Sequence, residues 1–355
     1  MERVNNSYSP YPWQLALVGC LIALSGMQIG YAGSIVSPEP ATGWQEKAVV
    51  NAERFMAVTA HPLATRTAVD VLADGGSAVD AAVAAQMVLN LVEPQSSGIG
   101  GGAFMLYWDA AARRLYALDG RETAPAAADA DYFRDVNGVP LKWHKAVVGG
   151  RAVGVPGTLH LLHTAHDLFG VRSWADLLEP AITLAIGGFA VSPRLAQSIA
   201  GAADRGLRQF SAARQYFFDE FGKPLKTGFL LRNPPFANAL RMIAREGIEP
   251  FYQGPIASRL VKTLESTSEL PALMTREDLS EYRTILRPPV CASYRSYSVC
   301  GIGPPSSGML TVGQILGLVE RFDLPNMGPN PDSIHLILEA SRLAFADRAR
   351  YMACL

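Results

Sequence analysis

Arg121 is a candidate for binding an anionic ligand in this sequence. It stands in the segment DGRETAP (119–125), directly after an apolar run that ends at Leu118. A planar guanidinium presented at the end of a strand suits two-pronged binding of a carboxylate. The same side chain could instead form an internal ion pair with Asp119 or Glu122, and spacing alone leaves both interpretations open.

A glycine cluster, GIGGGA (98–103), matches the GxGxxG/A pattern of dinucleotide sites, and Asp119 follows it at roughly the spacing expected for a ribose ligand. That site requires a strand, then the loop, then a helix whose N-terminus meets the pyrophosphate. Here a helical pattern precedes the glycines and the strand-like run AFMLYW follows them. The order excludes dinucleotide binding and leaves a tight crossover with close backbone approach.

Two further polar groupings are weaker candidates. The segment PPSSG (304–308) places two hydroxyls before a predicted helix, but it is not the GxSxG of a nucleophile elbow, so capping of that helix is favoured. His160, His163 and Asp167 share one helical face and could ligate a metal, but nothing else in the sequence supports a metal site, and a solvated helix face is strongly favoured. We therefore predict neither a metal nor a cofactor.

Composition narrows the class of protein. The 355 residues carry a net charge of -1, 49% are hydrophobic and 18% are charged. That apolar fraction can form a packed core, and a neutral chain lacks the basic field that holds nucleic acid. Four cysteines without a CxxC motif argue against both a disulfide scaffold and a zinc ribbon.

The N-terminus resembles a targeting segment. Residues 15–32 contain no charge and end in the small-x-small tripeptide GYA. This pattern predicts a cleaved secretory signal over residues 1–32, with an uncleaved anchor as the alternative. The next apolar run, 78–92, is too short to span a membrane and carries Asp80, Gln86 and Asn90. We expect a periplasmic or secreted protein without a stable span after signal cleavage.

Cys291 and Cys300 flank the stretch CASYRSYSVC. With a two-residue turn at Arg295-Ser296, these cysteines face each other across a hairpin. Export would place them in an oxidising compartment. A disulfide and two unpaired thiols are equally compatible with the sequence, because cross-strand pairs often miss the required geometry.

Strand and helix patterns alternate along residues 33–355 without a linker or repeat, which predicts a single α/β-type domain with two or more covered sheets. Strands are expected over 57–59, 103–108, 115–118 and in the hairpin 290–300. Helices are expected over 63–73, 78–92, 158–169, 173–187, 192–204, 235–246, 273–282, 308–320 and 333–352.

Several segments, taken in order, resemble the γ-glutamyltransferases (glutathione hydrolases). The resemblance covers about residues 45–352, and the joint pattern is far more specific than any single glycine motif. The matching segments are GGSAVDAA (75–82), LVEPQSSGIGGG (91–102), DGRETAP (119–125), VPGT (155–158), EPAI (179–182), FYQG (251–254), PPSSG (304–308) and EASRLAFADR (339–348).

The resemblance implies an N-terminal-nucleophile hydrolase with a four-layer αββα sandwich, here incomplete. Members of this family are made as one inactive chain that cuts itself. The new N-terminal Thr then attacks the γ-glutamyl carbonyl of glutathione or another γ-glutamyl compound. The resulting γ-glutamyl-enzyme passes its acyl group to water or to an amine. In that scheme Arg121 binds the α-carboxylate of the γ-glutamyl group.

The sequence departs from the family in one respect. The catalytic Thr opens a Thr-Thr/Ser-His segment in the family, and no such segment occurs in residues 1–355. We expect the nucleophile to lie beyond Leu355, residues 33–355 to form the large-subunit region, and a missing small subunit to complete the site. The chain alone is expected to be inactive. The alternatives are a cephalosporin or glutaryl acylase-type relative and a non-catalytic remnant that binds γ-glutamyl compounds or other carboxylates.

Overall fold

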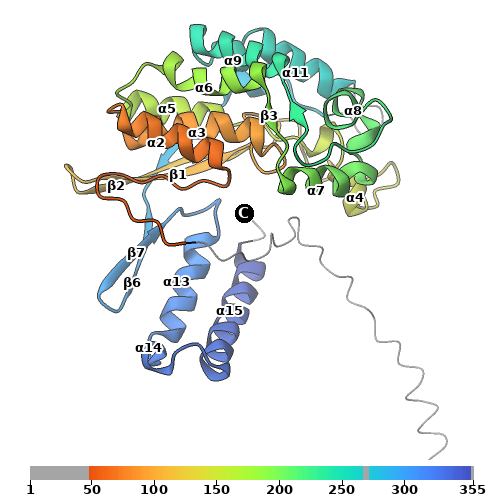
Figure 1. Cartoon of the computed structure of the whole chain (residues 1–355). Helices are drawn as coiled ribbons and strands as arrows, with labels where there is room; N and C mark the ends of the chain where they lie inside the picture. Colours follow the sequence, from red (N-terminus) through yellow and green to blue (C-terminus); the bar gives the residue numbers. More distant parts are fainter. Residues whose placement is uncertain (1–47, 267–271, 353–355) are drawn as a thin grey trace, which may run out of the picture. The chain divides into compact units, whose positions relative to one another are not determined.

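The computed structural model describes residues 48–266 and 272–352, and residues from Asn51 onwards form one compact unit (Figure 1). The predicted signal, residues 1–32, lies outside the described residues. Within the described ranges, no helix is both long enough and apolar enough to cross a bilayer.

The central sheet is antiparallel with strand order β1-β2-β5. Its side chains alternate between two faces, as the period of a strand requires. On one face Tyr107 lies opposite Tyr116, and both rings contact Phe169 of the covering helix α5. On the other face Leu106 and Trp108 are exposed. The strands are β1 (Ala103–Asp109), β2 (Arg114–Gly120) and β5 (Ile285–Arg287).

Helix α3 (Ala78–Val92) lies at the centre of the core and packs against α2 (Pro62–Ala73), α5 (Thr158–Phe169) and α6 (Trp174–Gly187). Ser77 and Asp80 form a capping box at its start. Asp80 is fully buried and also accepts the backbone N–H of Val171, so a single carboxylate fixes both the helix and the end of the α5–α6 connection.

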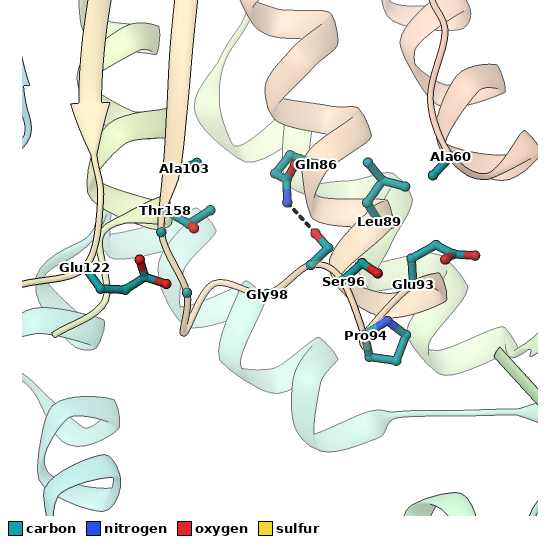
Figure 2. A pocket seen from close by; sticks show the side chains of 13 residues that line it. Ala60, Gln86, Leu89, Glu93, Pro94, Ser96, Gly98, Ala103, Glu122 and Thr158 are labelled. Carbon is teal, nitrogen blue, oxygen red and sulfur yellow. Dashed lines mark hydrogen bonds between the residues drawn. The ribbon is translucent and has the colours of Figure 1, made fainter. Parts of the chain in front are cut away.

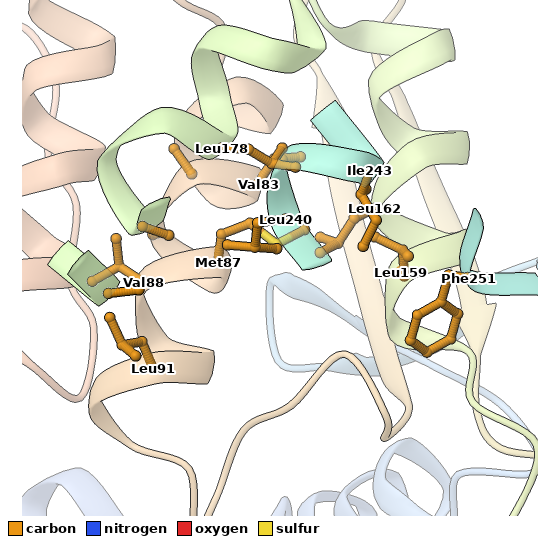
Figure 3. Packing of buried hydrophobic residues seen from close by; sticks show 14 of the residues in the cluster. Val83, Met87, Val88, Leu91, Leu159, Leu162, Leu178, Leu240, Ile243 and Phe251 are labelled. Carbon is orange, nitrogen blue, oxygen red and sulfur yellow. The ribbon is translucent and has the colours of Figure 1, made fainter. Parts of the chain in front are cut away.

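Apolar side chains from neighbouring helices interdigitate around α3 (Figure 3). Met87 contributes from α3, Leu178 from α6 and Leu240 from α9 (Pro234–Glu246), and none of these side chains is exposed. Burial of such side chains contributes about 1.5–3 kcal/mol each, which explains why α3 carries so few polar residues. The other α-helices that precede β5 in the sequence are α4 (Trp143–Ala146), α7 (Pro193–Ala202), α8 (Ser211–Phe217), α10 (Glu249–Tyr252), α11 (Pro255–Glu265) and α12 (Arg276–Glu281).

The C-terminal segment contains a hairpin and a pair of long helices. Strands β6 (Val290–Tyr294) and β7 (Tyr297–Gly301) pair with Cys291 opposite Cys300. The two sulfurs are bonded, which resolves the open alternative in favour of the disulfide. Helix α13 (Gly308–Val319) packs against β6 and against α15 (Pro331–Tyr351). A one-turn helix, α14 (Leu324–Met327), connects the two.

Most predicted elements are confirmed, with three differences. Residues 57–59 form no strand, because the Thr59 hydroxyl bonds locally to the His61 carbonyl and to Thr65. Several elements were not expected, namely helices α4, α8, α10, α11 and α14, strand β5, and the two-residue strands β3 (Phe189–Ala190) and β4 (Leu230–Leu231). The expected two or more sheets are present in the described residues but small: one three-stranded sheet, the pair of β3 with β4, and the β6–β7 hairpin. The three-stranded sheet also differs from the expectation because one of its faces is exposed.

Gly157 provides a test of the packing between α5 and the sheet. A Cβ at this position would overlap both the Tyr282 hydroxyl and the Gly120 carbonyl oxygen. We predict that Gly157→Ala lowers the free energy of unfolding by about 1–3 kcal/mol, measured by chemical denaturation. Gly187→Ala, at the end of α6 with no atom within 4 Å of the added Cβ, is the matched control and should be neutral or slightly stabilising. Equal midpoints for the two variants would contradict this packing.

Candidate functional site

Arg121 follows the last residue of β2, and its backbone is held on both sides. Its N–H donates to Asp119 Oδ1 at 2.9 Å, and its carbonyl accepts the Tyr282 hydroxyl at 2.7 Å. Asp119 is only 5% exposed, and its second oxygen accepts Arg287 Nε at 2.7 Å. Two side chains from residues 282–287 therefore fix the position of Arg121.

The Arg121 side chain itself is less constrained and is 56% exposed. Its Nε lies 3.5 Å from Glu122 Oε2, so of the two internal ion pairs considered above, the one with Glu122 forms. Asp119 is paired with Arg287 instead. An exposed pair at this distance stabilises the fold weakly, which leaves the guanidinium able to exchange Glu122 for a ligand carboxylate.

Three aromatic rings lie behind the Arg121 backbone. Tyr252 and Tyr282 stack with ring centroids 6.0 Å apart, and the His160 ring meets both edge-on at 5.7 Å. Burial, reinforced by the Asp119 and Glu122 carboxylates, raises the pKa of Tyr282 to about 12. Its hydroxyl therefore stays protonated and donates to Arg121 throughout the physiological range.

His160 anchors this ring cluster rather than a metal. Its Nδ1 accepts the Thr284 backbone N–H at 3.3 Å, and burial lowers the pKa of its imidazole. His163 pairs with Asp167 at 3.1 Å on the same helix. Among residues 48–266 and 272–352, no group of three or more His, Cys, Asp or Glu side chains is placed to hold a metal ion.

Two cavities lie near Arg121, and Glu122 lines both of them. One, of about 560 Å³, is lined by residues 121–125, 128–129, 132–133 and 151–154. The other, of about 490 Å³, lies between the end of α3 and the glycine loop (Figure 2). Both volumes fit the size range of small-molecule sites.

The glycine loop has the predicted order of helix, loop and strand, running from α3 to β1. The Gly101 carbonyl accepts the backbone N–H groups of Gly157 and Thr158 at 2.9 and 3.0 Å. A Cβ on Gly102 would overlap the Glu122 carboxylate. The glycines thus allow the loop to lie directly against the start of α5 and against Glu122.

Glu93 fixes the other end of this loop and was not singled out from the sequence. Its side chain is 3% exposed and forms an ion pair with Arg194 of α7. Arg194 also donates to the Ser96 hydroxyl at 3.1 Å. Glu93 lies inside the LVEPQSSGIGGG segment, but its partner is far away in the sequence, so the pair could not be predicted.

The serine hydroxyls near these sites are engaged in hydrogen bonds. Ser97 accepts from Gln86 and donates to Asn90 Oδ1 at 2.7 Å (Figure 2 shows the first of these bonds).

In the PPSSG segment, Ser306 accepts the Gly308 N–H, whereas Ser307 accepts from Arg348 and makes no side-chain cap. The expected side-chain cap on α13 therefore does not form, and Ser306 only holds the N–H of the first helical residue. Neither segment presents a base-activated nucleophile.

The described residues form a mixed helix-and-sheet fold in which Arg121 stands at a strand end beside the glycine loop. Solved structures of N-terminal-nucleophile hydrolases share this fold. The structure of Helicobacter pylori gamma-glutamyltranspeptidase agrees, with a TM-score of 0.81 and 35% identity over 86% of each chain. The chain belongs to the gamma-glutamyltranspeptidase family, whose model matches residues 64–353.

Curated relatives support the same family. The Glutathione hydrolase proenzyme of Bacillus subtilis is 37% identical over 338 residues, covering 94% of this chain and 56% of the relative. The Acylase ACY 1 proenzyme of Pseudomonas sp. (strain V22) is 36% identical over 310 residues, covering 86% and 54%. The chain therefore spans a little over half the length of these relatives.

The Glu93–Arg194 pair yields a stability prediction. Arg194→Met leaves a buried carboxylate without its cation, which we expect to cost about 3–5 kcal/mol of unfolding free energy. Arg245→Met removes the exposed pair with Glu246 and should change little. Denaturant unfolding of both variants provides the measurement, and a similar small change in both would show that Glu93 does not depend on Arg194.

Proposed function

We propose that this chain is the large-subunit portion of a γ-glutamyltransferase that hydrolyses or transfers the γ-glutamyl group of glutathione and related compounds. The observation that carries the proposal is the placement of Arg121. Its backbone is fixed by Asp119 and Tyr282, while its guanidinium is exposed at a cavity of ligand size. A fixed backbone with an accessible cation suits orientation of a substrate carboxylate.

In this scheme Arg121 binds the α-carboxylate of the γ-glutamyl group and thereby aligns the γ-carbonyl. The nucleophile, an N-terminal Thr, is not supplied by residues 1–355 and comes from a small-subunit portion. Its hydroxyl adds to the carbonyl while its α-amine takes the proton, and the amine leaving group departs with a proton. Water or a second amine then releases the γ-glutamyl group.

The exposed apolar face of the central sheet is evidence for a partner that covers it. Leu106 is 43% and Trp108 56% exposed on the face opposite α5, and Ile285 of β5 is 47% exposed. Apolar side chains on a sheet face are stabilised when another layer covers them. We propose that the small-subunit portion provides this cover. The N-terminal segment and the Cys291–Cys300 disulfide favour a periplasmic or secreted location.

A cephalosporin or glutaryl acylase is the second candidate, favoured by the match to Acylase ACY 1. The glutaryl group that a glutaryl acylase accepts has a terminal carboxylate but lacks the α-amine of a γ-glutamyl group. A binding protein without catalysis is the third candidate, and it would use the same Arg121 side chain. Glutamate and glutarate distinguish the first two, because only glutamate carries the α-amine beside the carboxylate.

Arg121→Gln tests the carboxylate assignment. We predict that the variant binds L-glutamate about tenfold or more weakly than the wild-type chain in calorimetric titrations, because a half-exposed charge-assisted contact is lost. Arg245→Gln, which changes an exposed arginine paired with Glu246, should bind as wild type does. Unchanged binding by Arg121→Gln would reject the assignment, and tighter binding of glutarate than of glutamate would favour the acylase.

The 355-residue polypeptide by itself should not release aniline from a γ-glutamyl anilide. Without the N-terminal Thr no acyl-enzyme forms, so the rate should equal that of a blank. Absorbance at the aniline product's wavelength follows the reaction, and a gamma-glutamyltranspeptidase of known activity serves as the positive control. Turnover above the blank by the purified chain would contradict the proposed division of the active site.

A further inference from the structure

A second arginine lines the cavity that contains Arg121. Arg151 belongs to a single 3₁₀ turn, Gly150–Ala152, and borders the same space of about 560 Å³. The two cations come from separate segments of the chain, one after β2 and one before α5. Nothing in the reaction scheme above uses Arg151.

Arg151 is only partly satisfied by the residues around it. Its Nη1 donates to the Tyr132 carbonyl at 2.8 Å, and its guanidinium lies 5.5 Å from the centroid of the Tyr132 ring. Its Nε is buried without a hydrogen-bond partner, and no ion pair to a carboxylate forms within the described ranges. Arg151 as a whole is half-buried, and a half-buried guanidinium without a counter-charge can donate charge-assisted hydrogen bonds, so a ligand anion at this position would be stabilised.

The two carboxylates that line the cavity do not pair with Arg151. Glu122 pairs with Arg121, and Asp129, which is exposed, accepts the Asp131 backbone N–H at 3.0 Å. Apolar and ring surface completes the lining through Tyr132, Phe133 and neighbouring residues. The cavity thus offers two guanidinium groups, of which the one on Arg151 lacks an acidic partner among the described residues.

We propose that Arg151 forms a second carboxylate subsite, so that the cavity takes γ-glutamyl peptides with a free C-terminal carboxylate. This inference rests on the proposed function, because Arg121 then holds the α-carboxylate of the same molecule. A guanidinium fork matches a carboxylate in geometry and charge. The subsite would make the chain selective for γ-glutamyl peptides over simple γ-glutamyl amides such as glutamine.

The alternative is a purely structural role, in which Arg151 only anchors the loop that contains Tyr132. If Arg151 has only a structural role, its substitution weakens the binding of every ligand to the same extent. A carboxylate subsite weakens binding only of ligands that carry the second carboxylate. The two roles therefore differ in a measurement that compares two ligands on the same variant.

The experiment titrates the full chain with S-methylglutathione and with its glycyl ethyl ester, by calorimetry. The methyl group prevents exchange with the Cys291–Cys300 disulfide. We expect the wild-type chain to bind the free acid about tenfold more tightly than the ester. Arg151→Gln should reduce affinity for the acid to that for the ester and leave the ester unchanged.

Arg121→Gln is the reference variant, because it should weaken both ligands to the same extent. Equal affinity of the wild-type chain for acid and ester overturns the subsite without recourse to any variant. Equal weakening of both ligands by Arg151→Gln assigns Arg151 to the structural role and also overturns it. If the wild-type chain binds neither ligand, the proposed function fails together with the subsite. If it binds both ligands equally, only the subsite fails, so the two results can be distinguished.

Discussion

The buried carboxylate of Asp119 is the interaction on which the site depends. One of its oxygens holds the Arg121 backbone N–H, and the other accepts Arg287 from β5. This single side chain therefore joins β2, to which it belongs, to β5. More than half the length of the described chain separates these two strands in the sequence. Because the carboxylate is only 5% exposed, its hydrogen bonds form in a low-dielectric environment and constrain geometry strongly.

Close backbone approach allows the rest of the arrangement. Gly120 and Gly157 let β2, α5 and the Tyr282 ring meet without intervening side chains. The glycine loop lies against the start of α5 through the Gly101 carbonyl. Glu93 and Arg194 then fix the helical end of that loop. The cavity at the glycine loop consequently has walls formed by residues that range from Ala60 to Thr158.

The sequence predicted the parts of this site that depend on local pattern. The strand end before Arg121 made it a candidate, and the family resemblance favoured carboxylate binding over an internal ion pair. The helix, loop and strand order excluded a nucleotide site. Tyr282 and Arg287 escaped detection because the register that pairs Asp119 with Ile285 is a long-range property. Strand β5 has only three residues and shows no alternation to read. The roles of Arg121 and of residues 33–355 as a large-subunit region stay predictions, as does the signal at residues 1–32.

The most direct test of the account is a crystal structure of the chain with L-glutamate bound. We predict that the ligand's α-carboxylate lies at hydrogen-bond distance, about 2.7–3.2 Å, from the Arg121 guanidinium, which has turned from Glu122 towards it. Electron density that places glutamate away from Arg121, with the Arg121–Glu122 pair unchanged, would contradict the account.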